Sequence, residues 1–119
     1  MSKVQKEAFG HGIDGLSAAL ALPVVEVGSL RFENRADRLQ KIIETVQRAG
    51  TYTSVVVTDP KGVVLATTDT SLKGQTIADL AKAKSPATVK DVNGETEAIV
   101  PIVSDGTTTV GVLRVRTRL

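Results

Sequence analysis

The chain has 119 residues, 41% of them hydrophobic and 24% charged, which is typical of one soluble globular domain. Its formal net charge is only +2, and the basic residues near its C-terminal end come without aromatic neighbours, so we expect no nucleic-acid partner. The absence of cysteine excludes disulfides, thiol catalysis and thiolate metal sites, and we expect neither a cofactor nor a metal.

Residues 1–27 predict an N-terminal helix. Apolar side chains recur there at the spacing of one helix face, at Phe9, Ile13, Leu16 and Leu20. Pro23 and Gly28 indicate where this helix ends. Its most apolar part, residues 16–25, has about half the length of a membrane span, and its start does not resemble a signal peptide.

A second helix is predicted over residues 33–49. Its apolar stripe is formed by Leu39, Ile42, Ile43 and Val46. Gly50 stands where a C-terminal cap belongs, because glycine readily adopts the left-handed conformation that ends a helix.

Residues 52–118 predict a sheet. The strands are expected at about 52–58, 63–68, 88–92, 96–103 and 108–117, with a short helix at about 76–83. Asp59-Pro60-Lys61-Gly62 has the composition of a tight turn, and Asn93-Gly94 is a strong hairpin signal. The fold class is therefore α+β: a five-stranded antiparallel sheet with the two helices on one face, and residues 69–86 covering the other.

Catalytic residue patterns are missing from this sequence. His11 is the only histidine, and its setting among glycines indicates a surface residue. Asp59 and Asp69 are better explained by turn chemistry than by a shared metal. Serines and threonines are plentiful, but no base is available to activate one, so we expect a protein that is not an enzyme.

A binding site remains, and we expect it to be a pocket between the sheet and residues 69–86. The candidate ligand-binding residues are Tyr52, Ser54, Thr67, Lys90, Glu97 and Arg114. Arg114 is the most informative, since it shares one face of the last strand with Val112, while Leu113 and Val115 point the other way. Two interpretations stay open: its guanidinium binds a ligand carboxylate, or it pairs with Glu97 on the neighbouring strand.

The sequence resembles the extracytoplasmic PAS-like sensor domains called Cache or PDC domains. The resemblance covers about residues 36–118. It is carried by the segments Val55–Asp69, Ser71–Gly74, Val100–Val103 and Gly111–Val115. They match a V-x-D-x-x-G-x-x-L-x-x-x-D hairpin, a Leu-x-Gly loop, a Pro-Ile strand and a closing Gly-x-x-x-Val strand. The single unit resembles the single-Cache type.

The resemblance implies a ligand-sensing part of a transmembrane receptor, either a chemoreceptor (methyl-accepting chemotaxis protein) or a sensor histidine kinase. It implies membrane segments on both sides of this chain and a periplasmic location, so we expect this segment to be a piece of a longer protein. Small carboxylates or amino acids are the implied ligands. It also implies signalling by a small shift of the last strand against the N-terminal helix, within a homodimer formed through that helix.

One departure from the family bears on the ligand. Citrate-binding relatives carry basic residues two and four positions before the Pro of the Pro-Ile strand, where this chain has Ile99 and Glu97. Their basic residue and His on the second strand correspond to Val64 and Thr67. One arginine cannot balance three buried negative charges, so we expect a monocarboxylate such as acetate, bound by Arg114, Thr67 and loop amides.

A second class of function is compatible with the same elements. A cytoplasmic interaction domain of the roadblock or profilin type also combines helices with a five-stranded antiparallel sheet. It would bind a protein partner through an apolar surface rather than a small molecule. Hydrophobic spans on both sides of this segment in the full gene would favour the receptor.

Overall fold

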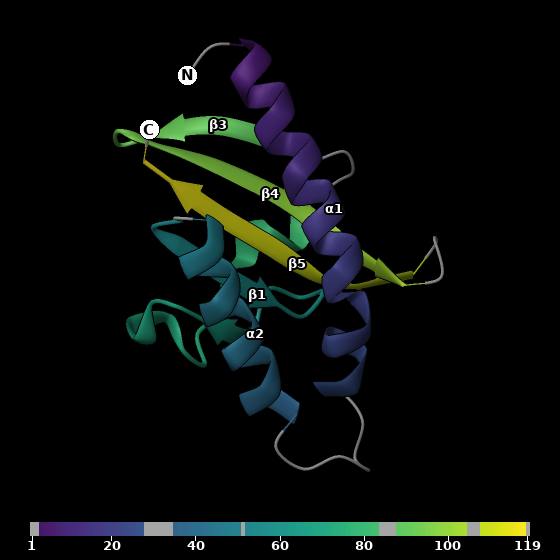
Figure 1. Cartoon of the computed structure of the whole chain (residues 1–119). Coiled ribbons are helices and arrows are strands. Elements are labelled where there is room, and N and C mark those ends of the chain that lie inside the picture. The colour runs from purple at the N-terminus through teal and green to yellow at the C-terminus, as the bar shows by residue number, and fades with distance from the viewer. Residues whose placement is uncertain (1–2, 28–34, 51, 84–87, 105–107, 119) are drawn as a thin grey trace.

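The computed structural model describes residues 3–27, 35–50, 52–83, 88–104 and 108–118. Two helices pack on one face of a five-stranded antiparallel sheet with the strand order β2-β1-β5-β4-β3 (Figure 1). The last strand, β5, lies in the centre of the sheet, between β1 and β4. The predicted α+β class and the antiparallel sheet are confirmed.

Helix α1, Lys3–Val27, crosses the sheet over β4 and β5 (Figure 1). It buries Ile13, Leu20 and Val24 against the strands. Pro23 lies inside the helix rather than at its end. A proline at this position removes the hydrogen bond to the carbonyl of Ala19, and because Ala19 is exposed, water can satisfy that group.

The segment Glu7–Val25 of α1 is long and apolar enough, by length and composition, to cross a membrane, with a mean hydropathy of 1.3. Core helices of soluble proteins also have such a composition. In this structure α1 forms part of the core, because its inner face packs on the sheet.

Helix α2, Arg35–Gly50, packs on β1 and β2. Leu39 and Ile43 of the predicted stripe are fully buried, while Ile42 and Val46 are half-buried. The predicted first residues of this helix, 33 and 34, lie outside the described part of the chain.

The strands have bounds close to those predicted. They are β1 Ser54–Thr58, β2 Val64–Thr67, β3 Thr88–Val92, β4 Glu95–Ser104 and β5 Thr108–Thr117. Alternate residues of each strand point toward the helices and form an aliphatic core. The sheet contributes Val55, Val57, Ala66, Ala98, Val100, Ile102, Leu113 and Val115 to it.

Both predicted hairpin turns are present. The amide of Gly62 donates to the carbonyl of Asp59 at 3.1 Å, and the Asp59 carboxylate accepts from the amides of Lys61 and Val63. Asn93 and Gly94 both have positive φ, as a two-residue turn of the primed kind requires.

The opposite face of the sheet is covered by the segment that follows β2. It contains two short 3₁₀ helices, η1 Thr70–Leu72 and η2 Ala78–Lys82, where the sequence predicted one helix at about 76–83. Leu80 of η2 is buried, and η2 contacts β5. The amide of Ile77 donates to the carbonyl of Gly62 at 2.8 Å, so the covering segment is held to the first hairpin.

Candidate functional site

The face of the sheet turned away from the helices carries the charged residues. The antiparallel register places Arg116 opposite both Ser54 of β1 and Glu97 of β4. Lys90 of β3 is in turn opposite Glu97. Arg114 lies on the same face, two residues before Arg116. Two cations, Lys90 and Arg116, and the carboxylate of Glu97 between them thus form a row across β3, β4 and β5.

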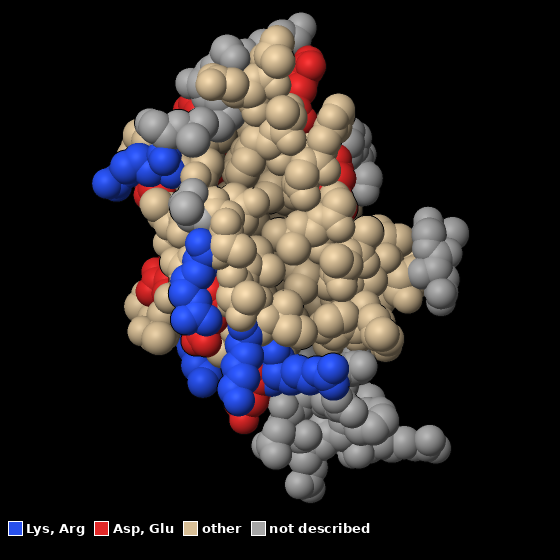
Figure 2. Space-filling view, in the orientation of Figure 1, with Lys and Arg blue, Asp and Glu red and all other residues tan. Residues whose placement is uncertain are grey.

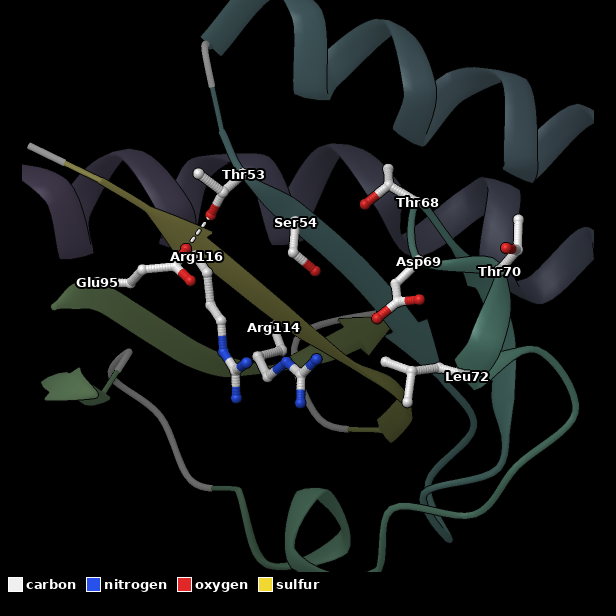
Figure 3. Close-up of a pocket in the computed structure, with 9 residues that line it drawn as sticks. All are labelled: Thr53, Ser54, Thr68, Asp69, Thr70, Leu72, Glu95, Arg114 and Arg116. Atoms are coloured by element: carbon white, nitrogen blue, oxygen red, sulfur yellow. Dashed lines mark hydrogen bonds between the residues drawn. The ribbon is translucent and has the colours of Figure 1, made fainter. Parts of the chain in front are cut away.

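A pocket with a volume of about 670 Å³ opens on this face, between the sheet and the segment after β2 (Figure 3). This volume falls within the range of small-molecule sites. Its lining comes from β1, β4, β5 and the stretch leading into η1. The lining residues are Thr53, Ser54, Thr68, Asp69, Thr70, Leu72, Glu95, Arg114 and Arg116.

Arg114 is the most unusual member of this lining. The residue is only 8% exposed, and its Nε has no hydrogen-bond partner among the described residues. Burial lowers the pKa of Arg114, and the nearby Arg116 guanidinium lowers it further. Arginine still keeps its proton, so a cation whose buried Nε has no hydrogen-bond partner among the described residues stands in the wall of the pocket.

Glu97 does not satisfy Arg114. Its Oε1 accepts a hydrogen bond from Nε of Arg116 at 3.0 Å, whereas Nε of Arg114 lies 3.8 Å from the same oxygen. The other oxygen, Oε2, lies 3.5 Å from Nζ of Lys90. One buried carboxylate is therefore shared by three cations, and its only hydrogen bond among them goes to Arg116.

Asp69 stands on the opposite side of the pocket from Glu95 and Arg116 and faces Arg114 (Figure 3). Its Oδ1 accepts from the amide of Ser71 at 3.1 Å and from the Ser71 hydroxyl at 2.7 Å. These two hydrogen bonds, and to a lesser extent the charge of Arg114, lower the pKa of Asp69. The second acid of the pocket, Glu95, accepts a hydrogen bond from the hydroxyl of Thr53.

The residues predicted as ligand-binding differ in position. Ser54 and Arg114 line the pocket, and Glu97 and Lys90 lie directly behind its two arginines. Thr67 is buried on the same face, but its hydroxyl already bonds to the backbone of Asp69. Tyr52 lies on the helix side of the sheet, in contact with the ring of Phe9, and does not line the pocket.

The structure adds Asp69, Glu95 and Arg116 to the pocket. Arg116 could have been found from the sequence, because it follows Arg114 by two residues and shares its face. The sequence pattern indicates a turn role for Asp69. Its side chain does cap η1, and the same side chain also lines the pocket. Glu95 carried no signal, since its position depends on the pairing of β4 with β5.

Among the described residues, no group of three or more His, Asp or Glu side chains could hold a metal ion. The lining of the pocket offers charge pairing and hydrogen bonding, through two guanidinium groups, two carboxylates and four hydroxyls.

Three solved structures have a similar fold. The sensor domain of the histidine kinase DctB from V. cholerae matches with a TM-score of 0.66 and 15% identity, over 90% of this chain and 46% of that one. The E. coli DcuS sensor domain has a TM-score of 0.61 and 16% identity, over 92% and 90% of the two chains. An extracellular ligand binding receptor from Desulfohalobium retbaense has a TM-score of 0.58 and 14% identity, over 99% and 26%.

At these identities the likeness concerns the fold. The chain has the fold of bacterial sensor domains, which is the fold that the resemblance to Cache domains implied. It spans 46% of the DctB sensor domain and 26% of the Desulfohalobium receptor. No protein-family model matches the sequence, and no curated protein matches it either.

Proposed function

We propose that this chain is the extracytoplasmic ligand-sensing domain of a transmembrane signalling receptor, of the chemotaxis or two-component type. In this role it binds a small carboxylate between the sheet and the segment after β2 and performs no catalysis. The observation that carries the proposal is the buried guanidinium of Arg114, with its unsatisfied Nε, in the wall of the pocket.

A ligand carboxylate would remove the energetic cost of this arrangement. A buried donor without a partner costs about 1–3 kcal/mol, and more when it belongs to a charged group. A carboxylate can accept two parallel hydrogen bonds from one guanidinium, which is the strongest pairing that arginine makes with an anion. Because Arg114 lies on β5, a ligand bound to it would directly contact the central strand of the sheet, which is also the last strand of the domain.

The charge around Arg114 favours a ligand with a single carboxylate, such as acetate. Asp69 and Glu95 line the same pocket, and Glu97 lies behind it. A second negative charge on the ligand would have only Arg116 as a counter-ion, whose Nε is already bonded to Glu97, and it would lie among these carboxylates, which is costly in a partly buried site. Thr67 supports this site indirectly, since its hydroxyl holds the backbone of Asp69.

Isothermal titration with acetate, propionate, succinate and citrate tests this proposal. We expect at least one monocarboxylate to bind, and Arg114→Met to lose that binding. Arg48→Met, which removes an exposed guanidinium from α2, is the matched control and should bind as the unchanged protein does. Binding of citrate alone, or equal binding by the Arg114→Met variant, would contradict the proposed site.

The cellular context belongs to the same proposal. We place the domain in the periplasm, anchored to the inner membrane by segments on both sides of this chain. The support is the resemblance of the sequence and the fold shared with the DctB and DcuS sensor domains. Reporter fusions along the full-length gene check the topology, and a reporter joined after residue 118 that is active only in the cytoplasm would contradict it.

We further propose that two copies of the domain associate through α1. Among the described side chains of this helix, three large apolar ones are exposed: Val4, Leu22 and Val25. At 100° per residue, 18 residues complete five turns, so Val4 and Leu22 share one side of the helix, with Val25 about 60° away. Figure 2 shows a largely uncharged surface over α1, whereas charged residues gather over α2.

Sedimentation equilibrium tests the association. We expect a dimer that Leu22→Lys disrupts, because a charge would be buried between the helices. Thr45→Lys, on the exposed side of α2, serves as the control. A monomer at all concentrations, or a dimer insensitive to Leu22→Lys, would contradict the proposed interface.

A further inference from the structure

Helix α2 contributes no described residue to the lining of the pocket, yet two of its side chains hold residues at the pocket wall. Gln40 contacts Thr67, and Nε2 of Gln47 donates to the carbonyl of Thr53 at 3.3 Å. The two glutamines are seven residues apart, which is close to two helical turns, so both extend from the same side of α2. This side of the helix therefore faces the segments that border the pocket.

The two contacts differ in how much they hold. Thr53 is already fixed by the sheet, because its amide donates to the carbonyl of Arg116 at 2.9 Å. Thr67 is the last residue of β2, an edge strand that has a neighbour only on the β1 side among the described strands. On the other side, Gln40 supplies the hydrogen bonds that a further strand would make, at 2.7 Å to the carbonyl of Thr67 and 3.0 Å from its amide.

Thr67 transmits this position to the pocket. Its hydroxyl accepts from the amide of Asp69 at 2.9 Å and donates to the carbonyl of Asp69 at 3.1 Å. The three residues that follow Thr67, namely Thr68, Asp69 and Thr70, all line the pocket (Figure 3). Because Thr67 is only 2% exposed, water cannot replace Gln40 at its backbone unless the end of β2 shifts, and the pocket wall would shift with it.

We infer that Gln40 is a positioning residue of the pocket, and that occupancy of the pocket is transmitted through Thr67 and Gln40 to α2. This inference rests on the proposed function and adds a second element, besides β5, that responds to the ligand. Coupling between two sites is reciprocal. If the contact between Gln40 and Thr67 favours the wall conformation that binds the anion, the bound anion strengthens that contact by the same factor.

Gln40→Glu tests the contact with little change of shape. The new carboxylate can still accept from the amide of Thr67 but cannot donate to its carbonyl. Gln47→Glu is the matched control, because it adds the same charge two turns along the same side of α2, while Thr53 stays fixed by the carbonyl of Arg116. Thermal unfolding of both variants checks that they are folded.

The first measurement uses the ligand-free protein. Amide hydrogen exchange at Asp69, two residues beyond the contact, should accelerate about fivefold or more in Gln40→Glu and change by less than about twofold in Gln47→Glu. Faster exchange at Thr67 with unchanged exchange at Asp69 would show that Gln40 only secures the edge of the sheet, and it would overturn the inference.

The second measurement is isothermal titration with acetate and propionate. Gln40→Glu should weaken the binding of either acid by about fivefold or more, and Gln47→Glu by less than about twofold. In the unchanged protein, the bound acid should also slow the exchange of the Thr67 amide, which donates to Gln40, although neither residue lines the pocket.

The outcomes separate this inference from the function on which it rests. If the acids bind Gln40→Glu as tightly as the unchanged protein, the positioning role is wrong and the proposed function stands. Equal weakening by the two glutamine variants would also contradict that role, because the added charge alone would explain it. If neither acid binds the unchanged protein, the proposed function fails, and the inference fails with it.

Discussion

At the scale of single residues, Arg114 combines high burial with an unsatisfied donor. Such a group weakens the folded state of the ligand-free domain, because its lost hydration is not replaced. Glu97 would keep Arg116 and Lys90 as partners if Arg114 were removed. The side chain is therefore better explained by binding than by stability.

We expect Arg114→Met to leave the free energy of unfolding unchanged or to raise it by about 1 kcal/mol, since an apolar side chain of similar length removes a poorly compensated buried charge. Urea unfolding of the ligand-free protein measures this change. A loss of more than about 2 kcal/mol would show that Arg114 supports the fold, and would contradict the interpretation of its burial as functional.

Asp69 leads to a prediction about pH. Because its pKa is lowered in the folded protein, the carboxylate stabilises the fold at pH values above the unfolded-state pKa of about 3.9, and this contribution is lost as the pH falls through the lower native value. Asp69→Asn should therefore lower the Tm at pH 7 but much less at pH 3. Thermal unfolding at both pH values measures the change in Tm caused by the substitution. An equal change in Tm at pH 7 and pH 3 would refute the prediction.

At the scale of elements, the edge strand β2 is joined to α2 by one side chain. Nε2 of Gln40 donates to the carbonyl of Thr67 at 2.7 Å, and Oε1 accepts from the amide of Thr67 at 3.0 Å. The amide side chain thus takes the place of a neighbouring strand. Thr67 in turn holds Asp69 through its hydroxyl, so α2 is linked to the pocket wall through two consecutive contacts, from Gln40 to Thr67 and from Thr67 to Asp69.

We expect Gln40→Ala to destabilise the protein by about 1–3 kcal/mol, because it leaves the backbone groups of buried Thr67 without partners. Amide hydrogen exchange at Thr67 should accelerate as well. Lys41→Ala, at an exposed neighbouring position on α2, is the control and should change stability by less than about 0.5 kcal/mol. Unchanged exchange at Thr67 would contradict this role of Gln40.

At the scale of the whole molecule, Gly111 marks the place where β5, β1 and α1 meet. A Cβ atom there would collide with the carbonyl oxygen of Thr58 and lie 3.2 Å from Cγ1 of Val24. Gly12, in α1, is the opposite case, since a Cβ there meets none of the described atoms within 4 Å. The same substitution should therefore have opposite effects at the two glycines.

Gly111→Ala should lower the free energy of unfolding by about 1–3 kcal/mol through overpacking. Gly12→Ala should raise it by about 0.5–1 kcal/mol, because alanine is the better helix former and the space is open. Denaturant unfolding measures both variants. A stabilising effect of Gly111→Ala would contradict the close approach of β5 to β1 and α1, and a destabilising effect of Gly12→Ala would contradict the open space beside Gly12.

Local sequence signals predicted much of this fold. Features that depend only on neighbouring residues are predicted correctly by the sequence. They are the turns at Asp59–Gly62 and Asn93-Gly94 and the apolar stripe of α2. Pro23 lies inside α1, which continues to Val27 within the predicted range 1–27, because an exposed helix surface tolerates a missing hydrogen bond. Tyr52, predicted as a ligand-binding residue, does not line the described pocket, and nothing local in the sequence indicates that it packs against Phe9 on the helix side.

The sequence by itself determined the elements, the antiparallel sheet and the alternation that puts Arg114 on the face away from the helices, because these follow from periodicity and turn chemistry. Only the tertiary structure decided which groups meet in the pocket. Arg114, Asp69 and Glu95 come from three separate segments, and strand register and the path of the chain after β2 bring them together. Sequence spacing also could not show whether Glu97 pairs with Arg114 or with Arg116. The structure decides it, because Glu97 Oε1 lies 3.0 Å from Nε of Arg116 and 3.8 Å from Nε of Arg114.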